Sequence, residues 1–292
     1  MNNLINKIFS ACCGKRYSIS EWYGRTGNNI QQVANCIMLA EKRGHCFEQN
    51  LKHEIIKRFE YNFGKDGYTQ KGKYFSWEAQ IDCKTNTIYG KNEINISKEY
   101  LYKNMRRICS NYILPYLNIP THEPFDDDTL VIHIRGGDIF ETEFTIASNY
   151  VQNPLAFYLK LIEKYPKILI VVEPNSNNPV VFELKKNSRL RFQSLSLKED
   201  FATLLAAKNL VTSGVGTFAI AAALCSKNIK NLFCSNIYLT EHLNYRMFEN
   251  TDVNIHETIL KDFIPVYPCS WTNNASQRKF LIDYQLPDKS FS

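Results

Sequence analysis

Hydrophobic and polar positions follow two alternating patterns through the second half of the chain. Short apolar runs are typical of buried strands: TLVIHI (129–134), KILIVVE (167–173), RLRFQSL (189–195), NLVTSG (209–214) and NLF (231–233). Amphipathic stretches between them are typical of helices: PLAFYLKLIEKY (154–165), NPVVFELKKN (178–187), KEDFATLLAAK (198–208) and TFAIAAALCS (217–226). Because strands that alternate with helices form parallel sheets covered on both faces, we predict an α/β fold with a Rossmann-like unit from residue 126 to about 240.

The first half is less regular. GRTGNNIQQVANCIMLAEKRG (24–44) predicts a glycine-rich turn and then a helix, which Gly44 ends. Its apolar face is formed by Ile30, Val33, Ala34, Ile37 and Met38. Residues 51–100 are polar and aromatic, with short strand-like pieces such as KYFSWEAQI and TIYG, and residues 98–117 look helical.

A proline-rich and acidic segment, PTHEPFDDDT, has the composition of a linker. We therefore predict two domains, residues 1–122 and residues 126–292. From residue 255 onward the pattern is irregular, and we expect this tail to pack back on the body.

Composition indicates a globular protein, with 44% apolar and 22% charged residues. The formal net charge of +6 favours anionic ligands, but the basic residues are scattered, so no nucleic-acid partner is expected. The nine cysteines form no CxxC pair and suggest reduced thiols in the cytoplasm. Residues 1–20 form either a frayed end or a short amphipathic helix for peripheral membrane contact, with Cys12 and Cys13 available for lipidation.

Three polar or glycine-rich turns follow strands of the predicted sheet. They cover residues 135–138, 173–178 and 213–217. In open parallel sheets, ligands bind beyond the carboxyl ends of the strands. We therefore expect these turns to share one edge of the sheet and to form a binding site.

The turn HIRGGD joins a cation and an acid through two glycines. Arg135 stands one residue past the apolar strand, where its planar guanidinium can bind a phosphate through two hydrogen bonds. Gly136 and Gly137 permit a close backbone approach or a positive φ. His133 alternates with isoleucines and faces either a helix layer or the site. The alternative is a core histidine beside a surface ion pair of Arg135 with Asp138.

The turn TSGVGT leads from a strand into a helix rich in small residues. It contributes Ser213, Gly214, Gly216 and Thr217. We expect Thr217 to be the N-cap, and the N–H groups that begin a helix can bind an anion. The turn lacks the GxGxxG spacing and the lysine of a P-loop, so neither NAD binding nor ATP hydrolysis is indicated. A tight turn with close helix packing is the alternative.

The turn GRTGNN upstream has similar chemistry. Gly24 and Gly27 bracket the turn. Arg25, Asn28 and Asn29 supply hydrogen-bond donors at the start of a helix, where they would either bind an anion or only cap the helix.

Several acids follow the predicted strands, and a general base must reach the proton that it removes. They are Asp138, Glu141, Glu143, Glu173 and Asp200. We take Asp138, Glu141 and His133 as the catalytic candidates and Glu173 as a substrate contact, whereas Asp200 would alternatively cap its helix. The acidic run FDDDT precedes a strand, where we expect a solvated loop, and no metal site is expected.

These turns occur in an order that resembles a family of sugar transferases. The segment at 24–44 resembles the GxxGNxxxQxxxxxxLAxxxG opening of α-1,2-fucosyltransferase-like proteins. VIHIRGGD resembles the HxRxGD motif shared by α-1,2-, α-1,6- and protein O-fucosyltransferases. LLAAKNLVTSGVGTFAIAAA is similar to a later segment of that family, and SNYVQNPLAFYLKLIE is similar to bacterial and viral relatives. The resemblance covers roughly residues 21–235.

The resemblance implies an inverting, metal-independent glycosyltransferase with a GT-B-like fold, in which two Rossmann-like domains face a cleft. It implies that Arg135 binds the pyrophosphate of a nucleotide sugar, with His133, Asp138, Ser213 and Thr217 at the other motif positions. The expected donor substrate is GDP-fucose, the expected acceptor is an oligosaccharide or polysaccharide, and no cofactor is expected.

Two departures from the family pattern leave other interpretations open. Gly136 stands where fucosyltransferases often have a second arginine, and Gly214-Val215-Gly216 replaces a sequence rich in serine and threonine. Another nucleotide sugar, such as UDP-xylose, would fit the same chemistry. A non-catalytic binder of nucleotides or glycans and a basic scaffold at a membrane surface are further alternatives.

Overall fold

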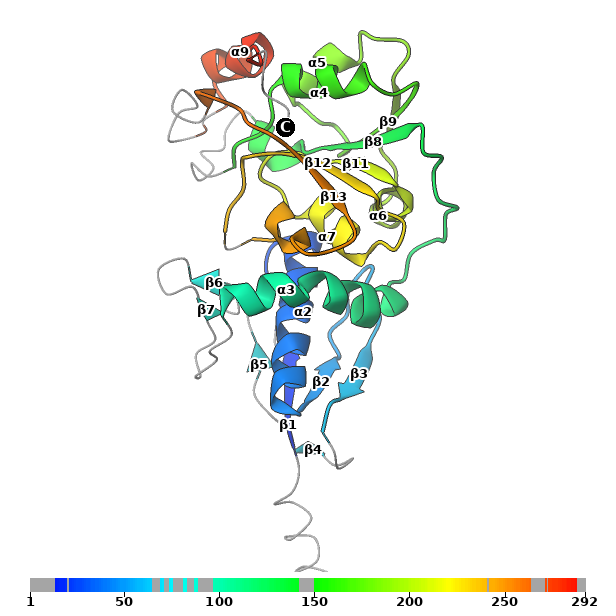
Figure 1. Ribbon diagram of the computed structural model, residues 1–292, viewed down its shortest axis with the longest axis vertical. Helices are drawn as coiled ribbons and strands as arrows, with labels where there is room; N and C mark the ends of the chain where they lie inside the picture. Colours follow the sequence, from blue (N-terminus) through cyan, green and yellow to red (C-terminus); the bar gives the residue numbers. More distant parts are fainter. Residues whose placement is uncertain are drawn as a thin grey trace, which may run out of the picture. The chain divides into compact units, whose positions relative to one another are not determined.

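The computed structural model describes residues 14–19, 21–64, 97–141, 150–240, 242–263, 271 and 273–287, together with four two-residue strands between 69 and 88 (Figure 1). The chain divides into two compact units, Met1–Asn118 with Thr240–Asn250, and Ile119–Leu239 with Thr251–Ser292. Each unit combines a sheet with helices, so the predicted α/β class is confirmed.

The first unit is built on a strand–helix–strand element. Strand β1 (Gly14–Ile19) leads into helix α2 (Thr26–Arg43) and then into β2 (Cys46–Gln49), which pairs parallel to β1. Strand β3 (Phe59–Asn62) returns antiparallel to β2. The short strands β4 (Thr69–Gln70) and β5 (Tyr74–Phe75) pair parallel to β1, while β6 (Ile81–Asp82) and β7 (Thr87–Ile88) pair with each other.

The apolar stripe of α2 forms the core of this unit. All five residues of its predicted face are fully buried: Ile30, Val33, Ala34, Ile37 and Met38. Gly44 ends the helix with φ of 61°, a left-handed conformation that glycine adopts at little cost. The helix and its end are therefore confirmed.

The second helical segment of this unit, predicted at 98–117, is also confirmed. Helix α3 (Lys98–Ile108) continues through a π-helical turn, η1 (Cys109–Ile113), and a 3₁₀ turn, η2 (Leu114–Tyr116). The later segment Thr240–Asn250, with the 3₁₀ turn η4 (Tyr245–Phe248), belongs to the same unit. Hydrogen bonds of 3.3 Å from Tyr102 Oη to the Thr240 carbonyl and of 3.2 Å from Asn244 Nδ2 to Tyr102 Oη join it to α3.

The second unit contains one sheet of six parallel strands. Its spatial order is β10-β9-β8-β11-β12-β13. The strands are β8 (Thr129–Ile134), β9 (Lys167–Val172), β10 (Arg191–Gln193), β11 (Asn209–Val211), β12 (Asn231–Ser235) and β13 (Asn254–Thr258). The first five coincide with the apolar runs of the sequence, so these strands are confirmed.

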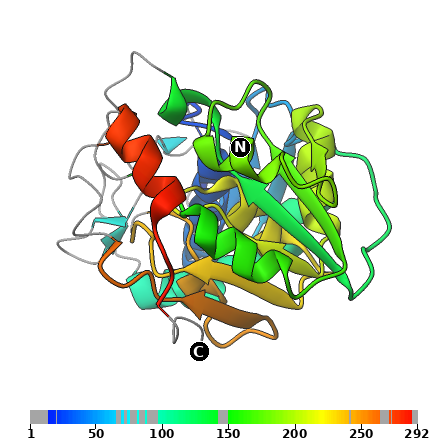
Figure 2. The ribbon, with the colours of Figure 1, turned by 90° about the horizontal axis from the view of Figure 1, so that it is seen from above.

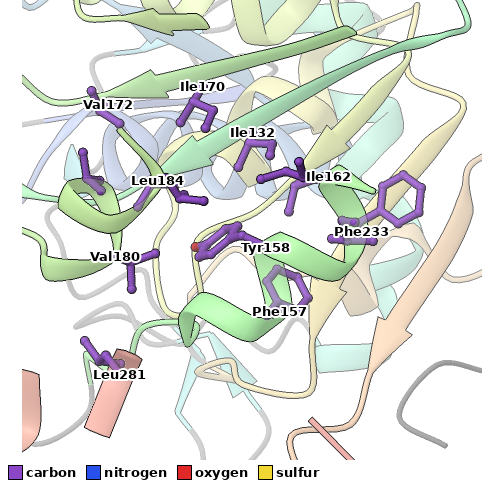
Figure 3. Close-up of a cluster of buried hydrophobic side chains, with 14 of the residues drawn as sticks. Ile132, Phe157, Tyr158, Ile162, Ile170, Val172, Val180, Leu184, Phe233 and Leu281 are labelled. Atoms are coloured by element: carbon purple, nitrogen blue, oxygen red, sulfur yellow. The ribbon is translucent and has the colours of Figure 1, made fainter. Parts of the chain in front are cut away.

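Helices cover both faces of this sheet. As drawn in Figure 1, α4 (Leu155–Ile162) and α5 (Pro179–Leu184) lie above it, and α6 (Leu197–Ala206) and α7 (Phe218–Cys225) lie below it. On the upper face, Ile132 and Ile170 of the central strands pack toward Tyr158 of α4 and Leu184 of α5 (Figure 3). Successive residues of a strand point to opposite faces, so His133 points to the layer of α6 and α7.

The end of the chain is more regular than its sequence predicts. The tail from residue 255 does pack on the body, but it is not irregular throughout. β13 adds an edge strand, and α9 (Ala275–Asp283) lies beside α4 and α5 (Figure 2). The sequence pattern predicts neither β13 nor α9, because NIHET has no apolar run and ASQRKFLID is largely polar. Asn274 caps α9 by accepting a hydrogen bond of 2.9 Å from Gln277 N.

The acidic run at 126–128 lies before β8, where the amino ends of the parallel strands meet. Lys167 contacts Asp126 at 2.9 Å and Asp128 at 3.1 Å, while Asp127 lies 3.2 Å from Lys208 and 3.0 Å from Lys230. Hydrogen bonds from these lysines lower the pKa of Asp126 and Asp127. The acids therefore form exposed ion pairs, in agreement with the interpretation as a solvated loop.

The strand order of the second unit determines where a ligand would bind. Numbered along the chain, the strands run 3-2-1-4-5-6, the order found in dinucleotide-binding sheets. The chain moves outward from β8 through β9 to β10, and then returns to the other side of β8 to form β11. Ligands of such sheets bind at this reversal, beyond the carboxyl ends of the two strands. For this unit the position lies after β8 and β11.

Candidate functional site

The turns HIRGGD and TSGVGT follow β8 and β11 and meet at this reversal. His133 Nδ1 lies 3.2 Å from Ser213 Oγ, in a buried hydrogen bond between the two strand ends. The imidazole also packs on Phe218 of α7, with ring centroids 5.3 Å apart. Two of the three predicted turns are thus joined directly.

His133 is almost fully enclosed, with an exposed fraction of 5%. Burial, together with the positive charge of Arg135, lowers its pKa to about 3. The imidazole is therefore neutral at neutral pH and a weak base. This favours a role in positioning Ser213 over a role in proton transfer.

Arg135 belongs to the HIRGGD turn, and its side chain reaches Val215 of the TSGVGT turn. This side chain is 15% exposed. The guanidinium carbon lies 4.7 Å from the centre of the Tyr150 ring, in a cation–π contact. Its hydrogen bonds are long, at 3.4 Å both from Nη2 to Asp138 Oδ1 and from Nη1 to the Val215 carbonyl. Stacking therefore orients the guanidinium, while its in-plane N–H groups are only weakly engaged by the protein.

Glycine is required at two positions of these turns. Gly137 has φ of 54° and begins the 3₁₀ turn η3 (Gly137–Phe140). Gly214 has φ of 34°, and a Cβ built there would lie 2.5 Å from the Val151 carbonyl oxygen. A Cβ on Gly216 would lie 3.2 Å from Ser213 Oγ and 3.8 Å from Arg135 Cδ, so Gly216 also borders the arginine.

The third predicted turn, after β9, packs against the first. A Cβ built on Gly136 would lie 2.2 Å from Ser176 Oγ and 3.2 Å from Ser176 Cα. Asn178 Nδ2 donates a hydrogen bond of 2.8 Å to the Arg135 carbonyl, and Asn178 Oδ1 caps α5 by accepting from Val180 N at 2.9 Å. The β9–α5 turn thus fixes the backbone on which Arg135 is carried.

The segment directly before α4, which the sequence indicated only through its resemblance to bacterial and viral relatives, holds the turn after β11. Asn153 Nδ2 donates to the Thr212 carbonyl at 2.9 Å, and Gln152 Nε2 donates to the Val215 carbonyl at 2.9 Å. Val215 N in turn donates to the Val151 carbonyl at 2.8 Å. We refer to residues 150–153 as the strap, because its first residue, Tyr150, also stacks on Arg135. Its sequence signal is weak, namely two amides directly before a helix.

The end of the chain holds the other side of HIRGGD. Trp271 Nε1 donates to the Ile139 carbonyl, and Asn273 Nδ2 donates to the Glu141 carbonyl at 3.2 Å. The Trp271 ring also packs edge-on against Phe140, with centroids 5.3 Å apart. Residues beyond 270 therefore support a turn that lies more than a hundred positions earlier in the sequence.

Thr217 occupies the N-cap position of α7 as predicted, but its side chain does not cap the helix. Its backbone is helical, with φ of −92° and ψ of −14°, whereas a capping residue is typically extended. The predicted N-cap position is confirmed, but no hydrogen bond of the Thr217 side chain caps the helix.

The predicted acids differ in their surroundings. The side chain of Asp138 is 42% exposed beside Arg135, Glu141 is exposed at the end of η3, and Glu173 is half-buried after β9. Asp200 is buried and accepts hydrogen bonds from Gln193 Nε2 at 2.9 Å and from Leu195 N at 3.2 Å. Ser196 is the N-cap of α6, so the alternative that Asp200 caps this helix is wrong. Glu143 lies outside the described residues.

Gly27 and Asn28 belong to the first unit, whereas the other candidates belong to the second. Gly27 is buried inside α2 rather than exposed in a loop. The Asn28 side chain packs against Gly24, because a Cβ built on Gly24 would lie 2.4 Å from Asn28 Nδ2. The segment 1–13, with the membrane-contact alternative, lies outside the described residues.

The five described cysteines are all buried: Cys36, Cys46, Cys109, Cys225 and Cys234. In the described part of the chain, no three His, Cys, Asp or Glu side chains are grouped so that they could hold a metal ion. No helix among the described residues has the length and apolar character needed to cross a bilayer.

The site can therefore present one oriented cation, neutral hydrogen-bonding groups and exposed carboxylates at the carboxyl edge of a parallel sheet. This combination suits an anionic ligand. The chain matches no protein-family model, no curated protein and no solved structure.

Proposed function

We propose that the second unit binds the diphosphate of a nucleotide sugar and that the protein is an inverting, metal-independent glycosyltransferase of the GT-B type. One observation carries this proposal. Arg135 lies at the reversal point of the sheet, stacked on Tyr150, with its planar donors only weakly occupied. A guanidinium of this kind is suited to two oxygen atoms of a phosphate group.

The transfer needs stabilisation of the leaving group. The bond between the anomeric carbon and the diphosphate oxygen breaks, and the diphosphate takes up the electron pair. The acceptor hydroxyl attacks from the opposite face, so the configuration at the anomeric carbon inverts. Arg135 would stabilise the charge that develops on the diphosphate, because its position is fixed before the reaction begins.

A carboxylate would take the proton of the acceptor hydroxyl. Glu141 and Asp138 are the candidates, because both side chains are accessible and close in sequence to Arg135. Asp138 contacts Arg135 at 3.4 Å and would exchange this contact for phosphate when a donor binds. The exposed Glu141 has no such competing role, so it is the stronger candidate for the base.

GDP-fucose is the first donor to test, and UDP-sugars are the second. The packing of Ser176 against Gly136 bears on this choice, since it leaves no room for a side chain at residue 136. A second arginine at this position, frequent in the fucosyltransferases that the motif resembles, cannot be accommodated without displacing Ser176. Donor recognition would therefore differ in this part of the site.

Ligand-dependent stabilisation tests the proposal. GDP or UDP should raise the melting temperature of the wild-type protein, and Arg135→Ala should remove this shift. Arg189→Ala is the matched control, because Arg189 donates to the Ile162 carbonyl at 2.9 Å and lies between α5 and β10, away from the carboxyl edge. If neither diphosphate shifts the wild-type melting temperature, the proposal is wrong.

A panel of GDP- and UDP-sugars with product analysis then separates an enzyme from a binder. Transfer to a glycan, or slow hydrolysis of the donor, indicates an enzyme. Binding that depends on Arg135 but gives no turnover with any donor would indicate a non-catalytic binder of nucleotides.

A further inference from the structure

Arg278 is a cation with only neutral partners. It lies in helix α9, and its Nη1 donates to Asn273 Oδ1 at 2.9 Å while its Nη2 donates to the Asn177 carbonyl at 2.8 Å. No carboxylate of the described residues lies within 4.0 Å of this guanidinium, whereas Arg135, Arg107 and Arg246 each have one.

The unpaired charge is partly withdrawn from water. Burial lowers the pKa of the Arg278 guanidinium from its ordinary value, and no acid among the described residues opposes this effect. A charge that is desolvated without a counter-charge is costly, and proteins usually pair such groups. The arrangement is therefore suited to an anion that the protein itself does not supply.

Arg278 reaches the turn that supports the site. Its partner Asn177 lies between Ser176, which packs against Gly136, and Asn178, which donates to the Arg135 carbonyl. Arg278 and Arg135 are thus both fixed to the same few residues of the β9–α5 turn.

The second partner of Arg278 is also fixed to the site. Asn273, which holds Nη1, donates to the Glu141 carbonyl at the end of the HIRGGD turn. Two independent contacts therefore place the Arg278 guanidinium at the carboxyl edge of the sheet, on the side of β8 and β9.

We propose that Arg278 is a second cationic contact for the anion bound at Arg135, which makes the site selective for a diphosphate over a monophosphate. This inference rests on the proposed anion site and deepens it. A single phosphate can be satisfied by one guanidinium through two hydrogen bonds. A diphosphate carries a second charged group, and α9 supplies the second arginine.

Binding measurements with matched ligands test the inference. Isothermal titration with GDP, GMP, inorganic pyrophosphate and inorganic phosphate compares the wild-type protein with Arg278→Gln and Arg135→Gln. Arg278→Gln should weaken the binding of GDP and pyrophosphate about tenfold, as expected for a lost hydrogen bond to a charged group, and change GMP and phosphate binding less than about twofold. Arg135→Gln should weaken all four ligands.

Two further variants separate contact from support. Arg278→Lys, which keeps the charge, should recover part of the lost GDP affinity. Arg189→Gln, the matched control, should bind all ligands as the wild type does. If Arg278 only holds the end of the chain in place, Arg278→Gln will weaken mono- and diphosphates by the same factor, and the inference is overturned.

The outcomes distinguish this inference from the proposed function. Equal GDP binding by wild type and Arg278→Gln, with loss in Arg135→Gln, overturns the inference and leaves the glycosyltransferase proposal standing. Pyrophosphate binding that depends on both arginines, without turnover of any nucleotide sugar, supports the inference and contradicts the enzyme. If no anion binds the wild-type protein, both are wrong.

Discussion

His133 and Ser213 form a buried hydrogen bond, with 3.2 Å between Nδ1 and Oγ, across residues that are 80 positions apart in the sequence. The bond joins the ends of two adjacent parallel strands at the reversal of the sheet. The imidazole is neutral at neutral pH, because its pKa is lowered to about 3. Its contact with the Phe218 ring and its hydrogen bond to Ser213 together fix its orientation. A histidine in the motif is therefore part of the architecture that carries the site.

Acid should destabilise the protein through His133. Its pKa is about 3 in the folded state, against about 6.5 in an unfolded chain, so the unfolded state binds the proton first as the pH falls. The contribution of His133 to the free energy of unfolding is fully present above about pH 6.5 and is lost as the pH falls from there toward pH 3. Between pH 7.5 and pH 5, this group should remove about 2 kcal/mol from the free energy of unfolding.

The variant His133→Asn isolates this effect, because asparagine keeps a hydrogen-bonding group but does not titrate. In urea unfolding, the wild type should lose about 2 kcal/mol more than the variant between pH 7.5 and pH 5. His53, with a pKa lowered to about 4 by burial, acts in the same direction but is present in both proteins. An identical pH dependence of the two proteins would refute the assignment.

Tyr150 should control the affinity of Arg135 for its ligand. Replacing Tyr150 by Leu removes the ring under the guanidinium, a contact of about 0.5–2 kcal/mol. We expect GDP or UDP to bind about 3- to 10-fold more weakly. Tyr150→Phe keeps the ring and should bind as the wild type does. If Tyr150→Phe is as weak as Tyr150→Leu, the hydroxyl and not the ring is responsible.

Gly136 should not tolerate even a methyl group. Gly136→Ala places a Cβ against Ser176 Oγ, and we expect a loss of about 1–3 kcal/mol in the free energy of unfolding. Ser176→Gly removes the obstructing side chain, so the double variant Gly136→Ala/Ser176→Gly should be more stable than the sum of the two single changes predicts. A double-variant cycle in urea measures this coupling. Simple additivity would show that the two residues do not obstruct each other.

Asn153 should be among the most sensitive residues of the strap. Asn153→Ala leaves the Thr212 carbonyl and the Ser235 hydroxyl without their partners, in a region with no access to solvent. We expect a loss of about 2–3 kcal/mol, since each buried group then bears its desolvation cost. Ser235→Ala removes only the 2.6 Å hydrogen bond to Asn153 Oδ1 and should cost less. Urea unfolding of both variants decides the order.

The sequence predicted the strands of the second unit well for a physical reason. Parallel strands covered on both faces need apolar side chains throughout, and all six residues of β8 are buried. Arg135, Gly136 and Ser213 could be assigned to the carboxyl edge, because a strand's direction fixes which end of it carries the turn.

The remaining parts depend on contacts that a linear pattern does not contain. Gln152 and Asn153 read as polar loop residues, yet each is 1% exposed and donates to a carbonyl about sixty positions away. Arg278 lies in a largely polar helix, and only the fold brings it to Asn177. The order of the strands in space could likewise not be predicted from the sequence. The pairing of β8 with β11 depends on the path of the chain between β10 and β11, and not on the sequence of either strand alone.

The reversal in strand order also has a consequence for the growing chain. β8 is the first strand of its sheet to be synthesised, and β9 pairs with only one of its edges. Its other edge lacks a partner until β11 arrives, at Asn209. An unpaired edge on a strand with mostly apolar side chains is a template for association with other chains. Fragments that end before residue 209 should therefore aggregate, and the proposed anion site becomes complete only after this late pairing has removed the exposed edge.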